Sequence, residues 1–189
     1  MIYQMPDTAL NPKQTIREIV GRPLSFYLGM RGREKEARLR CLMEQIELDP
    51  DIYLDRPVTA LSGGQKQRIG IARALAAEPE FIICDEVTSS LDQLVAEGIL
   101  KLLMKLQADL GLTYMFITHD LATVKAIADD VVVMQDGKVV EKGTRDEVFN
   151  PPHPPYTELL LSSVPEMDAG WLTRLLEKRA SAAGQAPRL

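Results

Sequence analysis

The stretch 61–86, LSGGQKQRIGIARALAAEPEFIICDE, places a helix directly before a short buried strand. Ser62 is a typical helix N-cap, and the helix is expected to end before Pro79. Phe81 to Cys84 form a continuous apolar run, which is typical of a strand buried on both faces of a parallel sheet. The run ends in Asp85-Glu86, so two carboxylates are predicted at the carboxyl end of a strand.

The pattern continues on the C-terminal side with alternating helices and strands. A leucine-rich stripe over 91–106 predicts a long helix that Gly111 ends, and 114–117 predicts a second buried strand. The turn sequence Gln135-Asp136-Gly137-Lys138 between valine-rich runs predicts a hairpin, and Thr144 caps a further helix. This alternation predicts an α/β layer architecture.

The flanking regions give weaker signals. Met1 to Tyr3 fit the end of a strand, and Asn11 with Pro12 fits the start of a helix. The stretch 29–48 is helical in pattern. It carries two pairs of opposite charge four residues apart, Glu34 with Arg38 and Glu36 with Arg40. Helices are also expected over 156–162 and 171–179, followed by a disordered end from 180 to 189.

Composition excludes several classes of protein. The 189 residues are 46% hydrophobic and 26% charged, as in an ordinary globular domain. A net charge of -5 without a Lys/Arg run weighs against nucleic-acid binding. No apolar run approaches the roughly 18 residues of a membrane span, and the first residues do not resemble a signal peptide, so any membrane link is expected through a partner protein. Cys41 and Cys84 are expected as free thiols.

Three features suggest chemistry, and each has a plainer alternative. Ser62-Gly63-Gly64-Gln65 opens a helix where backbone N–H groups can approach an anion, although a simple capped helix would look similar. Asp85 and Glu86 can hold Mg²⁺ and act on a water, or form a solvated acidic turn. His119 follows the second strand and can donate to a phosphate, or serve only a structural role.

Taken together, these features resemble the ATPase subunits of ABC transporters over roughly residues 1–160. The matching segments are the signature motif at 61–68, the Walker B strand at 81–86, the D-loop at Ser90-Leu91-Asp92, the switch histidine at His119 and the Q-loop glutamine at Gln4. In that family two ATPase domains dock head to tail and share two ATP sites, so a second such domain is an expected partner.

The resemblance implies a role for each matched residue. ATP-binding positions would be Ser62, Gly63, Gly64, Gln65, Gln4 and Asp92, with Gln65 mainly supporting the loop and Asp92 at the dimer seam. Asp85 and Gln4 would hold Mg²⁺, Glu86 would orient or deprotonate the attacking water, and His119 would contact the γ-phosphate. The implied chemistry is phosphoryl transfer by positioning and charge neutralisation, with ATP and Mg²⁺ as cofactors.

The resemblance also implies the domain organisation. We expect part of a P-loop NTPase (RecA-like) parallel sheet with an inserted helical subdomain. The ATPase domain would occupy 1–160, with the helical subdomain at about 11–77, the RecA-like part at about 78–150 and a tail at 161–189. The helical subdomain would dock on transmembrane permease subunits, at the cytoplasmic face of the plasma (inner) membrane.

This sequence departs from the family pattern at three points. Val87 and Ser90 stand where many members have proline and alanine, and neither side chain is expected to do chemistry. No G-x-x-x-x-G-K-[ST] occurs among the 189 residues. The chain is therefore expected to be a fragment that binds ATP weakly, does not hydrolyse it alone and folds poorly.

The two ends favour one branch of the family. Tyr3-Gln4, then 9–12, and the segment 153–165 resemble oligopeptide and dipeptide importers. Two alternatives stay open. One is a soluble ABC protein that acts on ribosomes or DNA, and the other is a non-enzymatic remnant or an interaction module that supplies 62–65 to an intact partner.

Overall fold

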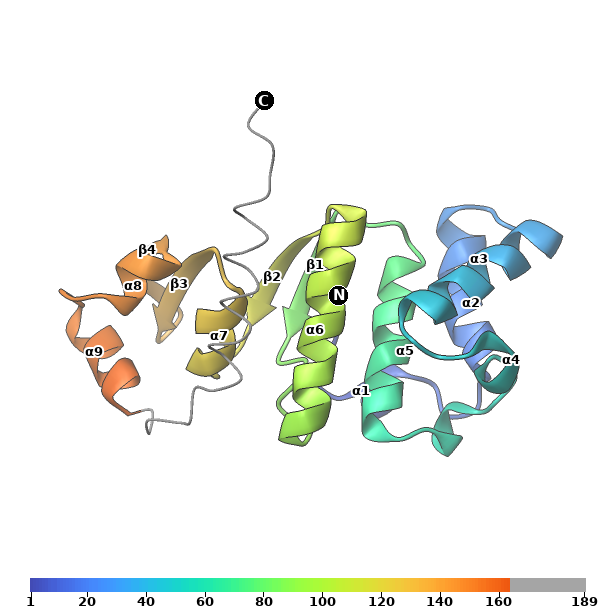
Figure 1. Cartoon of the computed structure of the whole chain (residues 1–189), viewed down its shortest axis with the longest axis horizontal. Helices are drawn as coiled ribbons and strands as arrows, with labels where there is room; N and C mark the ends of the chain where they lie inside the picture. Colours follow the sequence, from blue (N-terminus) through green and yellow to red (C-terminus); the bar gives the residue numbers. More distant parts are fainter. Residues whose placement is uncertain (164–189) are drawn as a thin grey trace, which may run out of the picture. The chain divides into compact units, whose positions relative to one another are not determined.

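The computed structural model describes residues 1–163 as two compact units. The first unit spans Met1–Ile117 and the second begins at Thr118. Figure 1 shows the elements of each unit coloured along the chain. None of the helices in the described range is long and apolar enough to cross a membrane. The predicted helix over 171–179 and the predicted disordered end lie outside the described residues.

The first unit combines four long helices and two strands with short helical turns. Its elements are α1 (Pro6–Ala9), α2 (Ile16–Tyr27), α3 (Gly32–Gln45), α4 (Pro50–Tyr53), a 3-10 turn (Val58–Ala60), α5 (Gly63–Leu75), β1 (Phe81–Asp85), α6 (Gln93–Leu110) and β2 (Thr113–Ile117). One apolar core of buried side chains joins the helices to the sheet. The helix that carries Gly63 and Gly64, α5, packs against α1, α2, α3 and α6.

The strands β1 and β2 pair in parallel, and Asp85 lies opposite Ile117. Ile2 adds a parallel bridge at the other edge of β1: its N–H donates to Ile83 O at 2.8 Å, and its carbonyl accepts from Asp85 N at 3.0 Å. The predicted strand end at the N-terminus is thus confirmed as a bridge. This pairing brings the residue after Tyr3 to the carboxyl end of β1.

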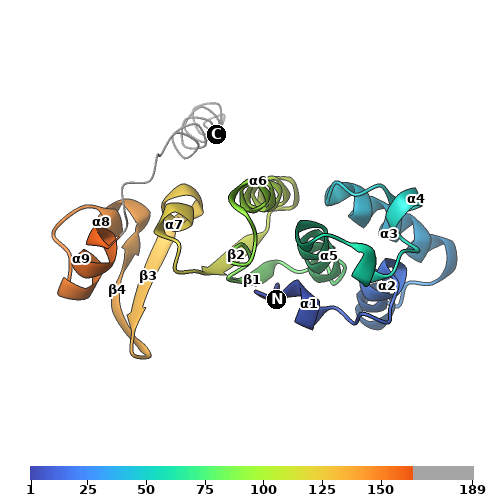
Figure 2. The ribbon, with the colours of Figure 1, turned by 90° about the horizontal axis from the view of Figure 1, so that it is seen from below.

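The prediction that both strands are buried on both faces is wrong for these residues. Helix α6 lies over one face of the sheet (Figures 1 and 2), and Ile82 and Cys84 on that face are fully buried. Phe81, Met115 and Ile117 point to the other face and are 51%, 49% and 43% exposed.

Two local predictions in the N-terminal half also fail. The helix α2 begins after Thr15 rather than at Pro12, because Thr15 and Glu18 form a reciprocal capping box. The side chain of Asn11 instead accepts from Lys13 N in a turn. The charged side chains of α3 pair with distant partners instead of each other. These ion pairs are Arg17–Glu36, Arg38–Glu78 and Arg40–Asp51.

The second unit is built around a hairpin. Its elements are α7 (Leu121–Ile127), β3 (Asp130–Gln135), β4 (Lys138–Thr144), α8 (Arg145–Phe149) and α9 (Pro155–Ser162). The strands β3 and β4 are antiparallel, and the turn places Asp136 and Gly137 at φ 49° and 75°, as a two-residue I′ hairpin requires. The predicted hairpin and the predicted Thr144 cap of α8 are confirmed.

Candidate site at the carboxyl end of the first strand

Gln4 and Glu86 lie in contact although 82 positions separate them. The Gln4 amide Nε2 donates to Glu86 Oε2 and also to Ser89 Oγ, the latter at 3.2 Å. The contact follows from the parallel bridge of Ile2 to β1, because the next residues of both segments then leave the sheet at the same edge. The structure thereby brings two of the predicted site residues together.

Glu86 occupies an unusual backbone conformation, with φ at 44°. A non-glycine residue in this region is strained by roughly 1 kcal/mol or more. Its N–H donates to Ile117 O at 2.8 Å, and its carbonyl accepts from Ser89 N at 3.1 Å. These bonds stabilise a turn at Glu86, so the chain leaves the direction of β1 after Asp85. The carboxylates of Asp85 and Glu86 therefore have different surroundings.

The N-terminus of α5 is capped as the sequence predicts. Ser62 Oγ accepts from Gln65 N at 3.4 Å, and Gln65 Oε1 accepts from Ser62 N at 3.0 Å. Gln65 Nε2 donates to the hydroxyl of Tyr53 at 3.1 Å, so this side chain is occupied with supporting the loop. The N–H groups of Gly63 and Gly64 have no acceptor among residues 1–163, which leaves the exposed helix end able to bind an anion.

The two glycines differ in their surroundings. A Cβ on Gly64 would lie 2.5 Å from Val95 Cγ1, whereas a Cβ on Gly63 would meet only Leu91 Cδ2 at 3.6 Å. Close packing between α5 and α6 therefore requires the absence of a side chain at position 64, independently of any ligand. At position 63 no such packing reason exists.

The structure gives weaker support for the predicted roles of Asp92 and His119. Asp92 caps α6, its carboxylate accepting from Val95 N at 3.1 Å, which accounts for an acidic residue there without a ligand. His119 is exposed and belongs to the second unit, between Thr118 and the Asp120 cap of α7. Its meeting with Asp85 and Glu86 at one phosphate stays a prediction.

Comparison with known proteins shows which proteins this chain resembles. The family model "ABC transporter" matches residues 1–89, and the model "Oligopeptide/dipeptide transporter, C-terminal region" matches 140–188. The oligopeptide transport ATP-binding protein OppF of Streptococcus mutans is 46% identical over 169 residues, which are 89% of this chain and 54% of that protein.

The chain belongs to the ABC transporter ATP-binding family. A second relative, the dipeptide transport ATP-binding protein DppF of Haemophilus influenzae, is 39% identical over 99% of this chain and 56% of its own length. The chain thus spans about half the length of the curated relatives it matches.

A solved ABC structure agrees with the fold. CbiO1 from Clostridium perfringens, part of the ABC transporter complex cbiONQ, matches with a TM-score of 0.68 at 33% identity, over 78% of this chain and 57% of that chain. The predicted α/β class with a parallel sheet of the P-loop NTPase type is confirmed. The proposed limits of the subdomains at 11–77 and 78–150 stay predictions.

The oxygen donors at the carboxyl end of β1 in this ABC chain are of the types that bind a magnesium ion together with a nucleotide. Among the described residues no three His, Cys, Asp or Glu side chains gather as a metal site. Mg²⁺ in nucleotide sites is commonly bound by one or two carboxylates together with the phosphates, so such a cluster is not needed. Asp85 and the Gln4 amide oxygen are the groups that would hold it here.

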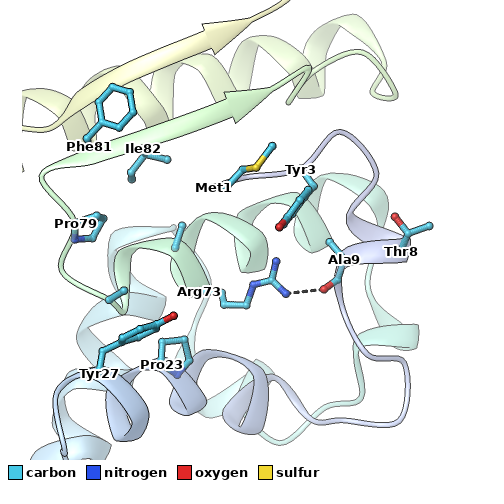
Figure 3. Close-up of a pocket in the computed structure, with 12 residues that line it drawn as sticks. Met1, Tyr3, Thr8, Ala9, Pro23, Tyr27, Arg73, Pro79, Phe81 and Ile82 are labelled. Carbon is cyan, nitrogen blue, oxygen red and sulfur yellow. Dashed lines mark hydrogen bonds between the residues drawn. The ribbon is translucent and has the colours of Figure 1, made fainter.

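Sequence reasoning missed a second feature of this ABC chain, a groove of about 670 Å³ beside the Gln4 segment (Figure 3). Its lining residues include Met1, Tyr3, Pro23, Tyr27, Arg73 and Phe81. Arg73 donates to Ala9 O at 2.6 Å, and burial lowers the pKa of its guanidinium below the ordinary value. Tyr27 is 66% exposed, and its ring packs edge-on against that of Phe26 with the ring centroids 4.9 Å apart. No local sequence signal joins these positions, because they come from four separate segments.

Proposed function

We propose that this chain supplies catalytic and ATP-contacting residues of the ATPase that powers an ABC importer of oligopeptides or dipeptides. The observation that carries the proposal is the contact of Gln4 with Glu86 at the carboxyl end of β1. In open parallel sheets ligands bind at that edge. The match of residues 140–188 to the oligopeptide/dipeptide C-terminal region supports the substrate class.

In this proposal, Glu86 orients or deprotonates the attacking water, and His119 approaches the γ-phosphate. Asp85 and Gln4 hold Mg²⁺, which when bound neutralises developing phosphate charge. Ser62, Gly63 and Gly64 contact the ATP held by a second ATPase domain, while Gln65 supports their loop and Asp92 lies at the seam. The phosphate grip comes from a segment with a P-loop, which the 189 residues do not contain.

The test is the ATPase activity of the assembled complex of this chain, a second ATPase domain and the permease. Glu86→Gln should lower the rate by about 10²- to 10⁴-fold, the size of a lost general acid–base contribution. The matched control is Glu44→Gln, on an exposed position of α3, which should leave the rate unchanged. Equal rates for Glu86→Gln and wild type would refute the assignment, and a complex that forms without any hydrolysis would favour an interaction module.

We further propose that the groove beside Tyr3 and Arg73 receives an apolar segment of the permease, which would place the chain at the membrane surface. The groove lining combines the exposed ring of Tyr27 with the half-buried guanidinium of Arg73, which suits an apolar segment that carries a carbonyl or carboxylate group. Tyr27→Glu should weaken co-purification with the permease. Leu110→Glu, at a 43% exposed position outside the groove lining, is the control. Equal loss in both variants would argue against the groove.

A further inference from the structure

Ser89 forms hydrogen bonds with both Gln4 and Glu86, the two residues in contact at the candidate site. Its hydroxyl donates to the backbone carbonyl of Glu86 at 3.0 Å, and the same oxygen accepts from Gln4 Nε2 at 3.2 Å. A serine hydroxyl has one hydrogen and two lone pairs. Because the hydrogen is used on Glu86 O, the oxygen can act toward Gln4 only as an acceptor.

This arrangement selects one orientation of the Gln4 amide. A carboxylate is an acceptor only, and Ser89 Oγ is also an acceptor here, so both neighbours require the NH₂ end of the amide. The carbonyl end, Oε1, is then turned away from Glu86 and accepts no hydrogen bond within residues 1–163. Mg²⁺ takes oxygen ligands, so this orientation leaves the amide oxygen available to bind a metal ion.

The same hydroxyl supports the strained turn. The bond from Ser89 Oγ to Glu86 O adds to the bond from Ser89 N to that carbonyl and holds Glu86 at its positive φ. The next residue, Ser90, reaches only the backbone carbonyl of Gln4, at 3.4 Å. The two neighbouring serines therefore act on different parts of Gln4, and only Ser89 bonds to its amide.

We propose that Ser89 is a positioning residue that keeps the Gln4 amide oxygen available as a metal ligand and holds Gln4 against Glu86. The inference rests on the proposed function for its role in ATP hydrolysis. The orientation itself is a property of the chain alone and can be measured without nucleotide.

The first experiment measures exchange of the Gln4 side-chain amide protons with water by NMR. Ser89→Ala should accelerate this exchange by about 2- to 10-fold, the effect of one neutral hydrogen bond. Ser90→Ala should change it by less than about 2-fold, and Ser89→Thr, which keeps the hydroxyl, should restore it. The Gln65 amide, bonded to Tyr53, is an internal reference that should not respond. An unchanged Gln4 amide in Ser89→Ala would overturn the proposal.

The second experiment measures the Mg²⁺ concentration for half-maximal ATPase activity of the assembled complex. Ser89→Ala should raise it by about 2- to 10-fold. In a Gln4→Ala background the same substitution should have no further effect, because the residue to be oriented is gone. An equal effect in both backgrounds would show a merely structural role for Ser89. Failure of Glu86→Gln to lower the rate would instead refute the proposed function and leave the NMR result standing.

Discussion

Substitution of the two signature glycines separates packing from ligand contact. A Cβ on Gly64 would lie 2.5 Å from Val95 Cγ1, about 1 Å inside the optimal carbon–carbon separation. Valine in a helix strongly prefers one χ1 rotamer, so Val95 cannot turn aside cheaply. Overpacking of this kind costs about 1–3 kcal/mol. Alanine gains up to about 1 kcal/mol over glycine in a helix, which offsets part of that cost.

Gly63→Ala is the matched control, because its Cβ would make only an ordinary 3.6 Å contact with Leu91. The free energy of unfolding of Gly64→Ala should therefore fall about 1–3 kcal/mol below that of Gly63→Ala. Urea unfolding followed by circular dichroism measures both, and an unchanged m value shows that the comparison is valid.

A double-mutant cycle with Val95→Ala tests the cause. Removing the valine methyls should relieve the clash, so Gly64→Ala should cost about 1–3 kcal/mol less in that background. Additivity within about 0.5 kcal/mol would refute the packing argument. The double variant carries an alanine side chain at position 64 without the clash. The ATP affinity of its assembled complex shows whether ATP binding also requires the absence of a side chain at that position.

Two other predictions follow from local structure. Thr144→Ala removes the capping box of α8 and should lower the free energy of unfolding by about 0.5–2 kcal/mol, whereas Thr144→Ser should retain most of it. Hydrogen bonds from Thr144 lower the pKa of the Glu147 carboxyl group. The carboxylate therefore stabilises the folded state above the ordinary carboxyl pKa, and this stabilisation is lost as the pH falls through the lowered pKa. The difference in the free energy of unfolding between wild type and Thr144→Ala should accordingly shrink in acid. Burial raises the pKa of Cys84 to about 12, so a disulfide reagent at pH 8 should label half-buried Cys41 first, and equal labelling rates in the folded chain would contradict that burial.

Elements with local stop and start signals could be predicted from the sequence. Ser62 caps α5, and Gly111 ends α6 in the left-handed conformation at φ 66°, both as expected. The start of α2 could not be predicted in this way, because two capping signals compete within five residues. Thr15 prevails over Asn11 since it forms a capping box and starts a helix whose apolar side is buried, which is a property of the tertiary fold.

The residues of the candidate site could be predicted from the sequence, but the hydrogen bonds between them could not. Family motifs identify Gln4 and Glu86 as members of one site, and the structure places them in hydrogen-bonding contact. The sequence predicts no chemistry for Ser90 and carries no signal for Ser89, because serine is a common residue in turns. The link from Ser89 to Gln4 crosses 85 positions, and no periodic pattern reports such a contact.

Helix α5 links the glycines at its own N-terminus to the Gln4 segment within the first unit. Buried Gln67 donates to Tyr3 O at 3.4 Å, and Arg73, about two turns further along, donates to Ala9 O at 2.6 Å. These bonds hold the backbone on both sides of Gln4 against α5, the helix that begins with Gly63 and Gly64. Because both donors lie on α5, a displacement of this helix would move the Gln4 segment with it or break these bonds. Arg73 and Tyr3 also line the groove, so a segment bound there would contact residues that form these two hydrogen bonds.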